Sequence, residues 1–120
     1  MKGKSFVVIH EEDDLIRELL ERWLGEAGYD VAIASPRQKR QKAPCLVIAN
    51  VASPRNAQPL LESLRAVYAA PVLALSGRFR RGLEGSAEAA CRLGVRKVLP
   101  KPFTREELLS AVDEALDGAA

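Results

Sequence analysis

The chain has 120 residues, 48% of them hydrophobic, so it is long enough for one domain with a single core and too apolar to be disordered. Its net charge of +2 does not indicate nucleic-acid binding through bulk charge. The apolar run that follows the basic N-terminus is too short for a signal-peptide core or a membrane span. We therefore expect a cytoplasmic protein without a membrane partner.

Cysteine and histidine usage excludes several kinds of site. Cys45 and Cys91 lie far apart in apolar segments, which predicts small buried side chains in a reducing compartment rather than a disulfide or a metal site. His10 is the single histidine, so a histidine-rich metal centre is excluded.

Short apolar runs alternate with amphipathic segments, a pattern typical of a parallel sheet covered by helices. The predicted strands are Ser5–Ile9, Asp30–Ala34, Leu46–Ala49, Val72–Leu75 and Lys97–Leu99. The predicted helices are Asp14–Ala27, one that begins near Pro59, Ser86–Leu93, and one that opens with the capping-box sequence Thr104–Glu107.

The connection between the second and third predicted strands is unusually short. Only Ser35–Pro44 lies between them, and the sequence of its middle part is basic and has no apolar face. Ten extended residues reach roughly 33 Å, whereas the crossing takes roughly 20 Å. The crossing is feasible, but the second helix of this architecture should be shortened or absent, leaving a basic loop.

Polar side chains follow four of the predicted strands at their carboxyl ends, where open parallel sheets place their functional sites. They are Glu11, Glu12, Asn50, Ser76 and Lys101. An aspartate at position 50 would complete a pocket for magnesium and a phosphoryl group, but the amide of Asn50 has no nucleophilic oxygen anion. The sequence therefore predicts a pocket that cannot be phosphorylated.

The order and spacing of these segments resemble the response-regulator receiver family, the CheY-like domains of two-component signalling. The segments that carry the resemblance are Ile9–Leu20, Glu26–Val31, Leu73–Gly77 and Leu99–Phe103. The resemblance covers the whole chain and implies a single receiver-like domain over residues 1–120. It also implies a flavodoxin-like α/β fold, with a five-stranded parallel sheet in the order 2-1-3-4-5 and helices on both faces.

The resemblance also assigns a role to each polar position. In family receivers a pair of acidic residues holds magnesium. The corresponding residues in this chain are Glu11 and Glu12. The position of the phosphoacceptor is Asn50. The position of the hydroxyl group that senses the phosphoryl group is Ser76, and the position of the lysine that pairs with the phosphoryl group is Lys101. The aromatic switch of the last strand falls on Val98, which has no ring. We interpret these residues as a vestigial phosphorylation pocket in a domain that is not an enzyme.

The departures from the family pattern disfavour cofactor binding on chemical grounds. Two longer glutamates and a neutral amide suit magnesium poorly, so we expect no cofactor, or weak Mg²⁺ binding at Glu11 and Glu12. Lys101 is then expected to pair with Glu11, Glu12 or Asp13. We assign Asp13 and Asp14 to the N-terminus of the following helix.

Two arginine-rich segments are candidate contacts with a protein partner. The candidates are Arg37, Lys39, Arg40, Arg78, Phe79 and Arg80. The partner classes are a signalling kinase, an output domain or a second copy of the chain, giving a homodimer. The alternatives are a functional receiver with altered phosphate or metal chemistry, and a polyanion- or nucleic-acid-binding module, which the low net charge does not favour.

Overall fold

The computed structural model describes residues 6–33, 44–51, 57–68, 70–76, 95–101 and 103–117. Five parallel strands form one sheet in the order β2-β1-β3-β4-β5. The strands are β1 (Phe6–His10), β2 (Asp30–Ile33), β3 (Leu46–Asn50), β4 (Val72–Ser76) and β5 (Lys97–Pro100). The described helices are α1 (Asp14–Glu26), α2 (Ala57–Tyr68) and α4 (Arg105–Asp117).

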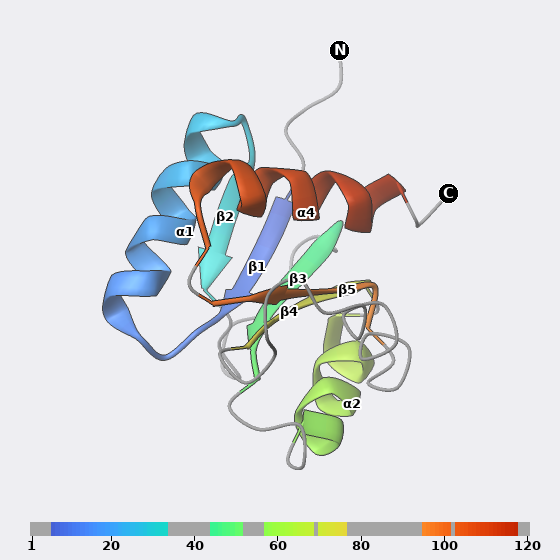
Figure 1. Cartoon of the computed structure of the whole chain (residues 1–120). Coiled ribbons are helices and arrows are strands. Elements are labelled where there is room, and N and C mark those ends of the chain that lie inside the picture. The colour runs from blue at the N-terminus through green and yellow to red at the C-terminus, as the bar shows by residue number, and fades with distance from the viewer. Residues whose placement is uncertain are drawn as a thin grey trace.

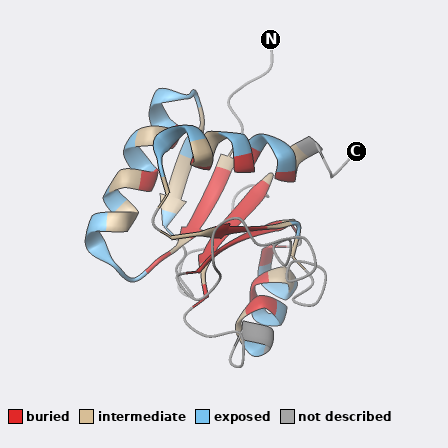
Figure 2. Cartoon of the chain, viewed as in Figure 1, coloured by how far each residue is buried: buried red, intermediate tan, exposed pale blue. Residues whose placement is uncertain are grey.

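Helices cover both faces of the sheet. α1 and α4 lie on one face and α2 lies on the other (Figure 1). The central strands β1, β3 and β4 are buried on both faces, as the red strands of Figure 2 show, which explains their continuous apolar sequences. The expected fold, with strand order 2-1-3-4-5, is therefore confirmed.

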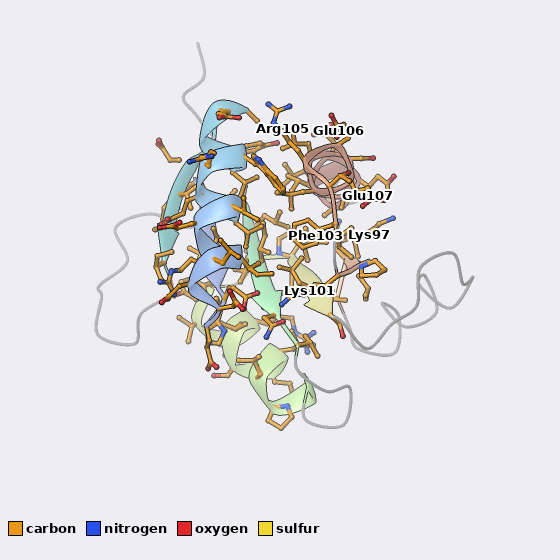
Figure 3. The ribbon with its side chains drawn as sticks, turned by 60° about the vertical axis from the view of Figure 1, so that its left-hand side comes forward. Lys97, Lys101, Phe103, Arg105, Glu106 and Glu107 are labelled. Carbon is orange, nitrogen blue, oxygen red and sulfur yellow. The ribbon has the colours of Figure 1, made fainter. Side chains whose placement is uncertain are left out.

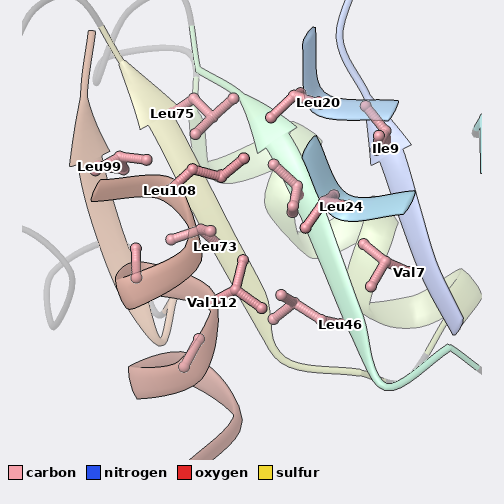
Figure 4. Packing of buried hydrophobic residues seen from close by; sticks show 13 residues of the cluster. Val7, Ile9, Leu20, Leu24, Leu46, Leu73, Leu75, Leu99, Leu108 and Val112 are labelled. Atoms are coloured by element: carbon pink, nitrogen blue, oxygen red, sulfur yellow. The ribbon is translucent and has the colours of Figure 1, made fainter. Parts of the chain in front are cut away.

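Alternate residues along each strand divide the core into two clusters. Val7 and Ile9 of β1 point toward α1 and α4, where they pack with Leu20, Leu24, Leu108 and Val112 (Figure 4). Val8, between them, joins the other cluster, with Leu61 and Leu64 of α2. Because both clusters are continuous across the strands, the sheet is a rigid base for the residues at its carboxyl edge.

Capping interactions fix both ends of α1. Asp13 is the N-cap residue, and its Oδ1 accepts hydrogen bonds from the backbone N–H groups of Leu15 (2.9 Å) and Ile16 (3.1 Å). At the other end Gly28 has φ +100°, and the N–H of Tyr29 donates to the carbonyl of Leu24 at 3.0 Å. This is a Schellman motif, and the left-handed backbone at position 28 favours glycine.

The predicted capping box of the last helix is confirmed. The backbone N–H of Glu107 donates to Oγ1 of Thr104 at 3.1 Å, and the N–H of Thr104 donates to Oε1 of Glu107 at 2.9 Å. Immediately before this box, the ring of Phe103 meets Trp23 of α1 edge-on, with ring centroids 6.3 Å apart. The segment between β5 and α4 is thereby packed against α1.

The predicted strand ends agree with the structure to within one residue. α2 begins at Ala57, two residues before the predicted start at Pro59. Proline is tolerated there because the first N–H groups of a helix have no partner within the helix.

Cys45 is half-buried rather than buried. Three predicted features lie outside the described residues: the Ser35–Ala43 part of the basic crossing, the helix predicted over 86–93, and Cys91.

No helix in the described part of the chain is both long and apolar enough to cross a membrane.

Candidate functional site

The polar residues predicted to converge lie along the carboxyl edge of the sheet. Glu11 follows β1 directly, Asn50 ends β3, Ser76 ends β4 and Lys101 follows β5. Parallel pairing places these ends next to one another, because Asn50 is in register with Leu75 and Ser76 with Pro100. The backbone N–H of Lys101 also donates to the carbonyl of Ser76 at 2.9 Å, which fixes where its side chain begins.

Lys101 joins two of these ends through its side chain. Its Nζ donates to Oδ1 of Asn50 at 2.7 Å and to Oε1 of Glu11 at 3.1 Å. Figure 3 shows the Lys101 side chain reaching inward over the edge of the sheet from its position after β5. The side chain of Lys101 is 19% exposed and that of Glu11 only 1%, so water screens this ion pair less than it screens a surface pair.

The buried Glu11 is held in place from the α1 side. Its Oε2 accepts the backbone N–H of Asp13 at 3.0 Å, and its backbone carbonyl accepts Nη1 of Arg17 at 3.3 Å. Asp13 also caps α1 and Arg17 pairs with Asp14, so the loop that presents Glu11 is part of the helix start. Both carboxylate oxygens of Glu11 therefore have a protein donor.

The contact with Lys101 also determines which way the amide of Asn50 points. A lysine ammonium group can only donate hydrogen bonds, so the atom 2.7 Å from Nζ must be the amide oxygen. The NH₂ group of Asn50 then faces away from Lys101.

The two glutamates predicted to act as a pair do not lie together. Glu11 points into the edge of the sheet, whereas Glu12 is exposed and forms no ion pair with any described residue. The expected partner of Lys101 is thus Glu11, and neither Glu12 nor Asp13 takes that place. Asp13 and Asp14 serve the N-terminus of α1, as predicted. The assignment of Glu12 to the pocket stays a prediction, and its exposed side chain does not pair with Lys101.

The remaining two predicted site residues are buried. Ser76 has no exposed surface, at the end of β4. Val98 is 1% exposed and packs into the cluster on the α2 face. A buried valine has no ring that could rotate between an inward and an outward position, so the aromatic switch expected of the family has no equivalent at Val98.

The donor set at this edge does not fit magnesium. Mg²⁺ requires several well-placed oxygen ligands in an octahedron. Glu11 supplies the one buried carboxylate of the described residues, and both of its oxygens are engaged, while Oδ1 of Asn50 accepts from Lys101. Among the described residues, no three His, Cys, Asp or Glu side chains converge as a metal site. The ammonium group of Lys101 occupies the place where a cation would meet these oxygens.

Sequence reasoning did not identify two residues that support this edge. Arg17 holds the backbone of Glu11, and its i,i+3 spacing from Asp14 was the available signal. Phe103, two residues after Lys101, anchors the following segment on Trp23. The residues predicted to contact a partner lie outside the described residues; they are Arg37, Lys39, Arg40, Arg78, Phe79 and Arg80.

Comparisons with known proteins agree with this architecture. No protein-family model matches the sequence, and no curated protein matches it. Among solved structures, chemotaxis response regulator CheY4 of Vibrio cholerae aligns over 95% of this chain and all of its own, with 20% identity and a TM-score of 0.72.

Two further structures give the same result. A candidate response regulator from Chloroflexus aurantiacus aligns over 96% of this chain and 99% of its own, with 27% identity and a TM-score of 0.74. The receiver domain of the Francisella response regulator 1452 aligns over 98% of this chain and 100% of its own, with 18% identity and a TM-score of 0.73. The chain therefore has the CheY-like receiver fold, over nearly the whole length of the structures it resembles.

Proposed function

We propose that this chain is a receiver-type domain of two-component or phosphorelay signalling that is not phosphorylated and acts through protein–protein contacts. The observation that carries the proposal is the double hydrogen bond of Lys101, to Asn50 at 2.7 Å and to Glu11 at 3.1 Å. In a working receiver this lysine pairs with a phosphoryl group on an aspartate. Here its partners are an amide and a buried carboxylate of the same chain.

The chemistry of position 50 supports the same conclusion. A carboxylate attacks phosphorus through an oxygen anion, and a neutral amide oxygen that already accepts from an ammonium group is a far weaker nucleophile. Restoring the nucleophile would leave the rest of the pocket unchanged, because Glu12 is exposed and Glu11 is engaged by Lys101 and Asp13. The proposal therefore assigns the domain one persistent pocket state and no enzymatic activity.

Val98 supports a binding role that does not depend on a switch. The residue is packed in the core and lacks a ring, so a change in the pocket has no aromatic group at this position through which to alter the surface. The binding surface would then have the same conformation at all times. Its partner would be a signalling kinase, an output domain or another copy of the chain. No nucleic-acid or membrane partner is proposed.

Nuclear magnetic resonance tests the single-state proposal directly. Backbone amide spectra of the isotope-labelled protein are recorded before and after addition of acetyl phosphate with magnesium. We expect the amide signals of Ser76 and Lys101 to stay at their positions. Displacement of these signals by the phosphodonor, but not by acetate with magnesium, would contradict a single pocket state.

A further inference from the structure

Three residues between the end of β5 and the start of α4 contact α1 or the loop before it. The contacts pair Lys101 with Glu11, Phe103 with Trp23, and Arg105 with Glu26. Figure 3 shows Lys101, Phe103 and Arg105 at successive heights beside α1. We name these three residues the strap. It extends from the pocket, just before α1 begins, to the last residue of that helix.

The three contacts of the strap differ in how far water screens them. Glu11 is 1% exposed and Lys101 19%, so their ion pair is largely shielded from water. Trp23 and Phe103 are half-buried and both pack against the core cluster beneath α1 and α4. The side chains of the Arg105 pair are 43% and 53% exposed, and an ion pair between such groups contributes little. The strap is therefore firm at the pocket and at the aromatic contact.

The aromatic contact lies well away from the pocket. Lys101 meets Glu11 before the helix begins at Asp14. Trp23 is nine positions further on, roughly 14 Å along the helix axis. Exposed charges at physiological salt are largely screened beyond roughly 8 Å. The charge of Lys101 therefore acts weakly on the indole ring through space, whereas Phe103, which contacts that ring, is only two residues from Lys101 along the chain.

We infer that the strap couples the pocket to the side of α1, so that a change at Lys101 displaces Phe103 against Trp23. Coupling between two sites is reciprocal, so a protein that binds α1 near Trp23 alters the Lys101 pair without entering the pocket. Val98 packs on the opposite, α2 face of the sheet. The strap thus connects pocket and surface without an aromatic residue at that position. The inference goes beyond the proposed function and does not rest on the absence of phosphorylation.

Nuclear magnetic resonance of Trp23 tests the forward direction. It is the single tryptophan, so its indole N–H gives one signal, which depends on the position of the Phe103 ring because aromatic rings displace the resonances of nearby protons. Lys101→Met should displace this signal. Lys97→Met is the matched control, because it removes the same charge at the other end of β5 and should leave the signal in place. An unmoved signal in Lys101→Met, or equal displacement in the two variants, would overturn the inference.

The reverse direction has its own reporter. The backbone N–H of Asp13 donates to Oε2 of Glu11 at 3.0 Å, at the pocket end of the strap. Phe103→Leu removes the aromatic ring at the far end and should displace the amide signal of Asp13. An Asp13 signal that stays in place would overturn the inference. Glu11→Gln removes the partner charge of Lys101, and it replaces Lys101→Met in the forward test if that variant does not fold.

Urea unfolding of combined variants shows whether the two ends of the strap act together. Lys101→Met with Phe103→Leu should lower the unfolding midpoint by less than the sum of the two single changes, because each change releases the contact that the other end supports. Lys97→Met with Phe103→Leu should be additive. Additive lowering for both pairs would overturn the inference. No phosphodonor enters these measurements, so this inference and the proposed function fail separately.

Discussion

The ammonium group of Lys101 lies 3.1 Å from a carboxylate oxygen of Glu11, a residue ninety positions earlier in the chain. The pair ties the end of the last strand to the end of the first, across the ends of β3 and β4. Because Glu11 is almost completely buried, the pair is part of the structure of the domain as well as of its pocket.

Removing the ammonium group should destabilise the fold. Lys101→Ala leaves the buried carboxylate of Glu11 and the oxygen of Asn50 without their shared donor, so we expect a loss of about 1–2 kcal/mol in the free energy of unfolding. Lys97→Ala is the control, since its partner Glu114 is 57% exposed, and it should cost less than about 0.5 kcal/mol. Urea unfolding measures both. Equally small losses would mean that the Glu11 pair is solvated.

Magnesium should bind weakly, on the order of millimolar or weaker, because the oxygens available to it already accept from Lys101 and from the backbone. Calorimetric titration of the folded protein measures this affinity. Binding at about tens of micromolar would show that the metal displaces Lys101 from its partners. In that case the alternative of a functional receiver with altered metal chemistry would be favoured.

The sequence predicts some features of the carboxyl edge of the sheet and not others, and the difference is whether a feature depends on neighbouring residues or on tertiary packing. Apolar runs and caps predict the strands, the start of α1 at Asp13 and the capping box of Thr104, because these features depend on neighbouring residues. Glu11 and Glu12 are chemically identical, and the direction in which the loop leaves β1 decides which of them is buried. That direction depends on packing of α1 against the sheet, which no local pattern encodes.

Stability should fall at alkaline pH in part through Tyr29. Burial, followed by the charges of Asp113 and Cys45, raises the pKa of the Tyr29 phenol above 10.0. The unfolded chain therefore releases this proton first as pH rises past that value, which favours unfolding. Urea unfolding between about pH 9 and about pH 11 should show a smaller loss for Tyr29→Phe than for the wild type. Identical losses would mean that Tyr29 ionises equally in both states.

Asn50 should resist conversion to aspartate in the folded protein. The usual route is attack of the next backbone nitrogen on the side-chain amide, and the N–H of Val51 donates to the carbonyl of Leu75 at 2.8 Å. The β-branched Val51 also crowds that approach. The mass of the peptide that contains Asn50, measured after prolonged warm incubation, should stay constant in buffer and increase in guanidinium chloride, where this hydrogen bond is absent. A faster increase in buffer would mean that the pocket promotes the reaction.

Intact-mass spectrometry after incubation with acetyl phosphate and magnesium tests the central claim most directly, with Asn50→Asp measured in parallel. We predict no added phosphoryl group on the wild type. We predict little on the variant, because Glu11 stays engaged with Lys101 and Glu12 stays exposed. A phosphoryl mass on the wild-type protein that maps to the peptide containing Asn50, Ser76 or Lys101 would contradict the account of a receiver fold held in one unphosphorylated state.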